Sequence, residues 1–301
     1  MKKEKNEKNE KKEVKPFMLF KIIIILVVFL IICLAYARYI STKGLIIKEY
    51  PIKTNLLSEE YDGFKIVQFS DLHYGTTNNI DDVKKIVKRI NEQNPDVVVF
   101  TGDLFDDSIE LNEDNINQLI EELNKIEAKI NKYAVPGNHD YDKKDYWNIF
   151  KEKTNFTLLT NTFDYVYYNS NTPIVFIGLD DYLMGDPVYK EAYQFLNDNT
   201  KDYYKILILH EPDQIDHLND FTENTEYDFN LAIAGHSHLG QVRLPFIGAT
   251  ITPQGAKNYY DEHYVLGDNK DLYINGGIGT SKLKIRFLNK PSINVYRFYT
   301  K

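Results

Sequence analysis

The chain has 301 residues, 43% of them hydrophobic and 14% aromatic, so a wholly disordered or fibrous protein is excluded. Its formal charge of −8 is unevenly distributed. Residues 1–37 hold eight Lys and four Glu, which gives +4, and residues 38–301 therefore carry −12. Because DNA binding depends on Lys and Arg contacts to phosphates, nucleic acid is an unfavoured partner for so acidic a body. The single cysteine, Cys33, excludes an intramolecular disulfide framework and a Cys-rich zinc module.

The N-terminus predicts a tail followed by a membrane-spanning helix. Residues 1–16 alternate Lys, Glu and Asn without an apolar period, so we expect a disordered cytoplasmic tail. Residues 17–37 are almost entirely Ile, Leu, Val and Phe, and this length can cross a hydrocarbon core of about 30 Å as a helix. A buried core helix is the alternative, but such helices rarely run this long without a polar face.

Two fates are open for this apolar segment. Ala35-Tyr36-Ala37 resembles the cleavage site of a signal peptide, but the uncharged stretch exceeds the usual h-region of about 7–15 residues, which favours an uncleaved signal-anchor. Eight Lys lie on the N-terminal side of the uncharged stretch 22–37 and only three basic residues follow it closely, so the positive-inside rule predicts a cytoplasmic N-terminus and an extracytoplasmic body. Residues 38–44 would form a short tether, at most about 25 Å long, that holds the body against the membrane.

Residues 45–301 predict one α/β domain, because no Gly/Ser/Pro-rich linker or repeat interrupts them. Apolar i, i+3, i+4, i+7 patterns predict helices at Asp81–Glu92 and Asn115–Ile130. Strands alternating with helices early and hairpin-like strands late indicate a layered fold with a mixed sheet, whose ligands bind at the carboxyl ends of strands. The predicted strands are Lys65–Ser70, Val97–Thr101, Tyr133–Val135, Ile174–Gly178, Ile206–Leu209, Leu231–Ala234 and Leu272–Ile274.

Polar motifs follow five of these strands, and they contain five of the seven histidines. The residue types are His, Asp and Asn without Cys, a set that suits borderline-to-hard divalent ions such as Mn, Fe or Zn. The motifs are Asp71-Leu72-His73, Gly102-Asp103, Gly137-Asn138-His139-Asp140, His210 and Gly235-His236-Ser237-His238.

The spacing of these motifs supports a shared metal site. Residues i and i+2 of an extended segment project to the same side about 6–7 Å apart, so Asp71 and His73 can converge on one ion or span two ions about 3.5–4 Å apart. The same holds for His236 and His238. Taken by itself, each motif is typical of an ordinary turn. A single histidine at a strand end, such as His210, is more often a hydrogen-bonded residue than a metal ligand. Five motifs in one order, each after an apolar strand, favour a metal site.

These motifs in this order resemble the calcineurin-like metallophosphoesterase superfamily. The resemblance covers about residues 45–300. One departure is Leu239, where a bacterial branch of the superfamily usually has a second glycine; it could narrow the rim of the site but removes no ligand. Members of that branch are membrane-anchored or exported phosphodiesterase-like proteins, and further segments resembling it are Gly63–Val67, Gly178–Asp181, Gly240–Val242 and Asn275–Gly279.

The resemblance implies a four-layer αββα sandwich with two divalent metal ions at the strand ends. The implied ligands are Asp71, His73 and His238 for the first ion, Asp103 for both, and Asn138, His210 and His236 for the second. His139 would be the catalytic histidine, oriented by a hydrogen bond to Asp140. The implied reaction is hydrolysis of a phosphodiester or monoester by in-line attack of a metal-bridging hydroxide, with His139 protonating the departing alkoxide.

Three functions remain open on the sequence alone. The ligand positions favour a metal-dependent phosphodiesterase or phosphomonoesterase. The acidic body argues against a nuclease of the same superfamily, and the complete ligand set argues against a binding or scaffold protein with a relict metal site. Because the body would lie against the outer membrane face, a lipid-linked phosphate is a further hypothesis for the substrate. The sequence leaves the ester, the metal pair and the oligomeric state open.

Other polar residues are expected to have structural roles. His217 and His263 fit surface or core positions, and Arg286 fits a surface ion pair better than a phosphate contact. Asp180 and Asp181 would line the cleft or form a turn. Core packing is favoured over an apolar rim beside the metals for the aromatic residues Tyr141, Tyr146, Trp147 and Tyr182.

Overall fold

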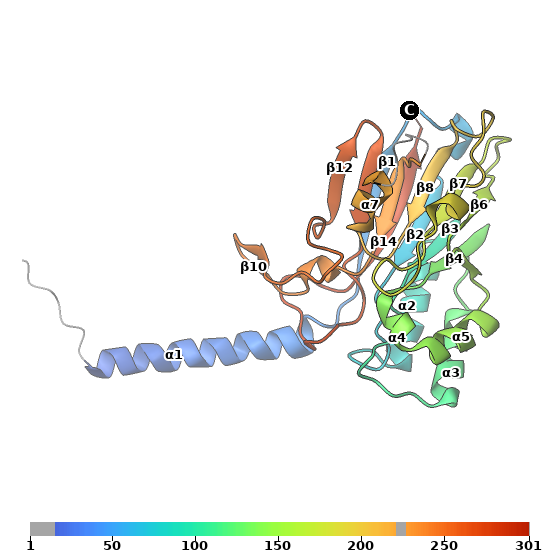
Figure 1. Ribbon diagram of the computed structural model, residues 1–301. Helices are drawn as coiled ribbons and strands as arrows, with labels where there is room; N and C mark the ends of the chain where they lie inside the picture. Colours follow the sequence, from blue (N-terminus) through green and yellow to red (C-terminus); the bar gives the residue numbers. More distant parts are fainter. Residues whose placement is uncertain (1–15, 221–226, 301) are drawn as a thin grey trace, which may run out of the picture.

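The computed structural model describes residues 16–220 and 227–300 (Figure 1). Within this part, a long helix projects from a layered body that contains two six-stranded sheets. The tail predicted at residues 1–16 lies, except for Pro16, outside the described residues.

The first sheet has the strand order β1-β14-β2-β3-β4-β5. It is mixed, because β14 runs parallel to β1 and antiparallel to β2, whereas β2 to β5 are parallel to one another. Its strands are β1 (Ile46–Lys53), β2 (Lys65–Phe69), β3 (Val97–Thr101), β4 (Asn131–Val135), β5 (Thr157–Leu158) and β14 (Ser292–Tyr299).

The second sheet has the order β12-β13-β9-β8-β7-β6. Its central strands β13, β9, β8 and β7 are parallel, and antiparallel strands close both edges. Its strands are β6 (Thr162–Val166), β7 (Ile174–Gly178), β8 (Tyr204–Ile208), β9 (Leu231–Ala234), β12 (His263–Gly267) and β13 (Lys270–Ile274). A separate short hairpin pairs β10 (Arg243–Leu244) with β11 (Gly248–Ala249).

Three hydrophobic cores establish the layers. In β3, Val97 and Val99 face the core between the two sheets, whereas Val98 and Phe100 face a core shared with helices. A third core packs the outer face of the second sheet, including Leu207 of β8, against further helices. Successive side chains of a strand point to opposite faces of the sheet. Because these strands are buried on both faces, their sequences are continuous apolar runs. The predicted αββα sandwich is confirmed.

The helices cover the two outer faces. Those on the first sheet are α2 (Ile80–Asn91), α3 (Glu113–Leu123), α4 (Asn138–Asp142) and α5 (Lys144–Lys153); those on the second are α6 (Tyr189–Ala192) and α7 (Gln214–Asp220). There are also short helical turns, η2 (Glu59–Tyr61), whose Tyr61 packs in the core between the sheets, and η3 (His238–Gly240). The prediction that one helix extends to Ile130 was wrong. Ile126 continues the apolar period and is buried, but the amide of Ile130 donates to Asp96 O and so draws this segment toward the sheet.

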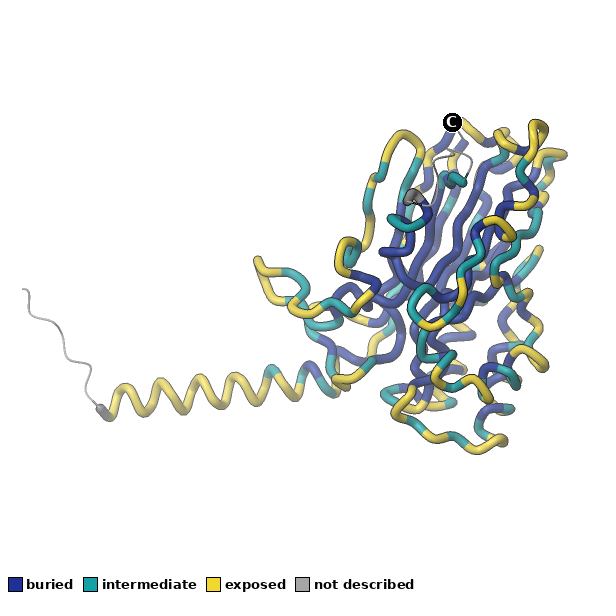
Figure 2. The backbone as a smooth tube through the Cα atoms, viewed as in Figure 1, coloured by how far each residue is buried: buried dark blue, intermediate teal, exposed yellow. Residues whose placement is uncertain are grey.

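The apolar N-terminal segment forms α1 (Pro16–Ala35), which continues as a short π-helix, η1 (Tyr36–Ile40). Figure 2 shows that α1 is exposed along most of its length, which excludes the buried core helix. By length and composition, the helix Phe17–Ile40 can cross a membrane. The expected extended tether is shorter than seven residues, because the helix continues to Ile40 and Ser41 and Thr42 are buried against the body.

Candidate metal centre

The loops that follow the central strands of both sheets meet at one edge of the sandwich. After β2 and β3, the amide of Asp71 donates to Gly102 O at 2.9 Å. Across the two sheets, the amide of His236, after β9, donates to Asp71 Oδ1 at 3.0 Å. The carboxyl ends of strands from both sheets therefore converge, as the sequence predicts.

The backbone at this edge is held in an unfavourable conformation. Five of the seven expected ligands have φ between +41° and +62°: Asp71, His73, Asp103, His236 and His238. Such left-handed residues cost about 1–3 kcal/mol each and cluster at functional sites. Gly102, at φ +88°, allows the close packing of these loops, because a Cβ there would lie 2.7 Å from His210 Nδ1.

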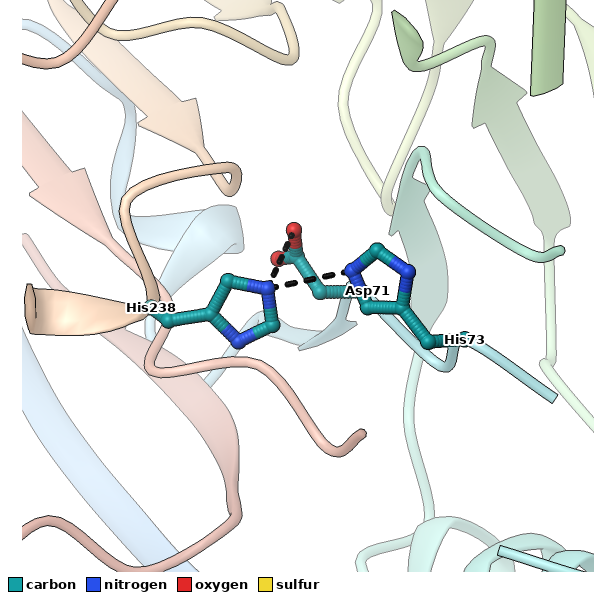
Figure 3. Close-up of side chains that lie close together, drawn as sticks. All are labelled: Asp71, His73 and His238. Carbon is teal, nitrogen blue, oxygen red and sulfur yellow. Dashed lines mark hydrogen bonds and ion pairs between the residues drawn. The ribbon is translucent and has the colours of Figure 1, made fainter. Parts of the chain in front are cut away.

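One group of side chains consists of Asp71, His73 and His238, and we call it the first triad (Figure 3). His73 Nε2 and His238 Nε2 are 3.1 Å apart, and His238 Nε2 is 3.5 Å from Asp71 Oδ1. All three residues are buried. A carboxylate and two imidazole nitrogens thus face one point from two sheets.

Asp103, His210 and His236 form the second triad. His210 Nε2 lies 3.2 Å from both Asp103 Oδ2 and His236 Nδ1. The same Asp103 Oδ2 is 3.6 Å from His73 Nε2 of the first triad. Asp103 therefore stands between the two triads, which is the position required of a carboxylate that contacts two ions.

The tautomers of the second triad fit a bound cation. His210 Nδ1 lies 2.6 Å from Thr101 O, and His236 Nε2 lies 2.6 Å from Gln254 O. A carbonyl oxygen only accepts, so each of these ring nitrogens must be the protonated one. In the neutral rings, the lone pairs of His210 Nε2 and His236 Nδ1 then face each other beside a carboxylate oxygen. This arrangement is repulsive unless a metal ion lies between them or His210 takes a second proton; burial opposes that proton, but the Asp103 carboxylate outweighs burial and raises the pKa of His210 well above its usual range.

The buried charges of the centre shift its proton affinities. Burial lowers the pKa of His236 to about 3, so this imidazole is neutral, as a metal ligand must be. Burial opposes ionisation of Asp103, but positive charge on the facing imidazoles of His210 and His139 outweighs it and holds the pKa of the carboxyl well below its usual range. Asp103 is accordingly ionised and available to a cation.

The sequence of residues 64–240 matches the family model described as calcineurin-like phosphoesterase. The chain belongs to this family. The resemblance found in the motifs is thereby confirmed, and the protein is a phosphoric ester hydrolase.

Relatives of this phosphoesterase extend the similarity over most of the chain. The Bacillus subtilis metallophosphoesterase YkuE is 36% identical over 267 residues, which cover 87% of this chain and 88% of that protein. A Danio rerio transmembrane protein with metallophosphoesterase domain is 25% identical over 279 residues, covering 87% of this chain and 61% of that protein. The UDP-2,3-diacylglucosamine pyrophosphatase LpxG of Chlamydia muridarum is 26% identical over 290 residues, covering 78% and 83%.

The remaining expected site residues of the phosphoesterase, Asn138 and His139, line a cavity of about 570 Å³ that also reaches Asp103, His236 and His238. The Oδ1 atom of Asn138 is buried without a hydrogen-bond partner among the described residues, which fits a metal ligand. The amide of His139 donates to Asp103 Oδ1 at 2.9 Å, and its ring groups with His73 and Asp103. The structure therefore brings all eight residues named as ligands or catalytic histidine to one place.

Asp140 does not orient the His139 imidazole, so that prediction was wrong. Its buried carboxylate accepts hydrogen bonds from the amides of Gly137, Asp103, Leu104 and Phe105 at 2.9–3.2 Å. Four backbone donors take up its acceptor sites, because Asp140 lies in the first turn of α4 and reaches back to the loop after β3. Asp140 is thus a positioning residue for the loop that carries Asp103.

Acidic residues near the centre were missed by the sequence interpretation, namely Asp106, Asp107 and Glu211, of which Glu211 groups with His210 and Asp181. Asp106 Oδ2 lies 3.2 Å from His73 Nδ1, and both side chains are buried. Asp107 Oδ1 lies 3.4 Å from His139 Nδ1. The signal was present in the Gly102–Asp107 segment, where two further aspartates follow Gly-Asp within four residues.

Arg286 does not form the predicted surface ion pair. Its side chain is fully buried and donates to Gly276 O, to Gly279 O and, from Nη2 at 3.1 Å, to His238 Nδ1. Burial lowers the pKa of Arg286 to about 10, which leaves the guanidinium charged at neutral pH. Nothing in the sequence around Arg286 distinguishes this buried role from a surface one.

The other residues that the sequence left unassigned have structural contacts. His217 pairs with the Tyr182 hydroxyl at 2.6 Å and His263 with Asp271 at 2.6 Å. Leu239 does not narrow the rim, because its side chain is buried in the core of the second sheet despite a φ of +49°. Asp180 and Asp181 accept turn amides, Trp147 is buried in the core beneath the first sheet, Tyr141 donates to Asp180, and Tyr146 donates to Glu110.

Proposed function

We propose that this phosphoesterase hydrolyses a phosphate ester of a membrane lipid with the help of two divalent metal ions. The observation that carries the proposal is the pair of buried triads joined by Asp103. The proposed ligands are Asp71, His73 and His238 for the first ion, Asn138, His210 and His236 for the second, and Asp103 for both.

The bound ions would supply positive charge to the phosphate oxygens and lower the pKa of a water molecule toward neutrality. The chain itself fixes the geometry, because buried loops under backbone strain hold the ligands before substrate arrives. His139 lies in the same cavity, and its amide is fixed to Asp103 Oδ1. From that position its imidazole would give a proton to the departing oxygen of the ester.

Two observations support a lipid substrate. The helix Phe17–Ile40 can span a membrane, and Ser41 and Thr42 after it are already buried in the body, so the body would lie close to the bilayer. A relative from Chlamydia muridarum is named for the hydrolysis of a diacylated pyrophosphate. The Lys distribution supports a cytoplasmic N-terminus and an extracytoplasmic body, so protease added to intact cells should digest residues 38–301.

The test uses the full-length chain, stripped of metal and reloaded with Mn²⁺, Fe²⁺ or Zn²⁺. Substrates are bis-p-nitrophenyl phosphate, p-nitrophenyl phosphate, single-stranded DNA, and phospholipids or polyprenyl phosphates in vesicles. We expect about two ions per chain, metal-dependent p-nitrophenol release and hydrolysis of a lipid ester, with DNA left intact. A chain that takes up no divalent ion contradicts the metal centre, and activity confined to soluble esters contradicts the lipid substrate.

A further inference from the structure

The turn of the β10–β11 hairpin exposes apolar side chains at a cost to the fold. Phe246 is fully exposed and Ile247 is 72% exposed. Phe246 has a φ of +66° at the tip of a turn closed by the Ile247 amide on Leu244 O, a position that favours Gly or Asn. In water, this phenylalanine buries nothing and strains the backbone. Residues that break local rules in this way mark functional surfaces.

The hairpin projects from the body in the direction in which α1 extends (Figure 1). The two are also connected through residues 286–287. The amide of Arg286 donates to Ala37 O at 3.0 Å, and the ring of Phe287 packs edge-on against Tyr36 at the end of the apolar helix. The amide of Arg243, in β10, donates to Phe287 O at 2.9 Å. The base of the hairpin is therefore fixed where the helix enters the body.

The cavity of the metal centre is also lined by the residues that flank the base of this hairpin, at 240–242 and 250–254, and by the segment 281–285. Its inner end holds Asp103, His139 and the histidines of the Gly235–His238 motif. Its outer walls carry the apolar side chains of Val242, Ile251, Leu283 and Ile285, of which Ile251 and Leu283 are 70% and 55% exposed. An apolar path thus leads from the hairpin side of the body to the proposed ions.

Lys282 and Lys284 flank Leu283 on the same exposed segment. Lysines beside apolar side chains suit the boundary of a bilayer, where the apolar groups enter the acyl region and the ammonium groups remain with the lipid phosphates. The same boundary fits the hairpin turn, which carries Phe and Ile at its tip.

We propose that the β10–β11 turn inserts into the bilayer that α1 spans, and that the apolar walls of the cavity receive an acyl chain of a lipid whose phosphate reaches the metal centre. This inference rests on the proposed function and adds the route of the substrate. The lipid enters sideways from the membrane, with its chain against Ile251 and Leu283.

The insertion is tested without reference to activity. Phe246→Trp in the full-length chain, reconstituted in phosphatidylcholine–phosphatidylglycerol vesicles, should be quenched by lipids brominated on their acyl chains. Val265→Trp is the matched control, because Val265 is 71% exposed and belongs to β12, a strand that lies away from α1 in Figure 1; it should not be quenched. The single native tryptophan, Trp147, is buried and gives a constant background. A Phe246→Trp variant whose fluorescence the brominated lipids leave unquenched overturns the inference.

The substrate route is tested by a ratio of activities. Phe246→Asn and Leu283→Asn should each lower the ratio of vesicle-lipid to bis-p-nitrophenyl phosphate turnover about tenfold, since each removes an apolar contact with lipid. Asn suits the left-handed turn, so the hairpin should keep its fold. An unchanged ratio overturns the inference. A wild-type chain that hydrolyses neither substrate overturns the proposed function instead, and the quenching result then still decides the insertion.

Discussion

The two triads of the proposed metal centre present the same kinds of atoms toward their centres. They differ in the groups that contact the ring nitrogens pointing away from those centres. Each presents an aspartate oxygen and two imidazole nitrogens to one point. In the first triad, the outer nitrogens of His73 and His238 face charged side chains, Asp106 and Arg286. In the second triad, those of His210 and His236 face backbone carbonyls.

This difference predicts at which of the two proposed ion sites a side-chain substitution can change the affinity for metal. Backbone carbonyls belong to the strands and loops of the fold, so they fix the tautomers of His210 and His236 whatever side chain is attached. Asp106 and Arg286 can be replaced, and their opposite charges act on the two rings of the first triad in opposite ways. A carboxylate behind a metal-bound histidine raises the basicity of the ring, whereas a guanidinium lowers it. Replacement of one of these side chains should therefore weaken the first ion, whereas the second has backbone support that a side-chain substitution leaves in place.

The largest effect is expected from Asp103→Asn, because Asp103 is the one carboxylate between both triads. Hydrolysis of bis-p-nitrophenyl phosphate should fall about 10³-fold or more, and the content of both metals should drop. Elemental analysis and initial rates measure the two effects. Asp198→Asn, on a fully exposed turn, is the control that should change neither. Full turnover by Asp103→Asn would remove its role at both ions.

His139→Ala tests a histidine that belongs to neither the first nor the second triad. It should retain both metals and lose about 10²–10⁴-fold in rate on esters with poor leaving groups, with a smaller loss on p-nitrophenyl esters, since a good leaving group needs no proton. The dependence of rate on leaving-group pKa measures this. His263→Ala, outside the centre, should behave as wild type. Equal losses on all leaving groups would show that His139 is no general acid.

Asp106→Asn separates the two triads directly. Loss of the carboxylate behind His73 should weaken the first ion about 10–100-fold and leave the second in place, so the stoichiometry at limiting metal should fall from about two toward one. Competition with a chelator, followed by elemental analysis, measures it. Asp107→Asn is the control, because the neighbouring Asp107 faces His139 and not a triad imidazole. Simultaneous loss of both ions would contradict independent support of the triads.

The sequence predicts the proposed ligands of the triads far better than the residues that contact those ligands from outside. Asp71, His73, Asp103, His210 and His236 follow apolar strands, and strand periodicity alone places such residues at one edge of a sandwich. Local pattern carries no such information about Arg286, which is buried through contacts with Gly276, Gly279 and His238 that only the tertiary fold creates.

Asp140 was misassigned for the same reason, because its hydrogen-bond partners are brought to it by the tertiary fold. An aspartate next to a histidine suggests a hydrogen bond between the two side chains. In the structure, four amides from two loops donate to the Asp140 carboxylate instead, and the local sequence does not reveal these donors. The residues proposed as metal ligands lie at strand ends, whereas the residues that hold them in place depend on contacts distant in the chain.

The smallest effect is expected from Gln254→Ala, which tests the second triad at its outer face. The partner of His236 Nε2 is the carbonyl oxygen of Gln254, and this atom remains when the side chain is removed. Affinity for the second ion should therefore stay within about twofold of wild type, as for other exposed substitutions. Metal titration of Gln254→Ala beside Asp106→Asn measures the contrast. If Gln254→Ala released the second ion as readily as Asp106→Asn releases the first, the side chain would matter at both sites, and backbone support could not explain the difference between the triads.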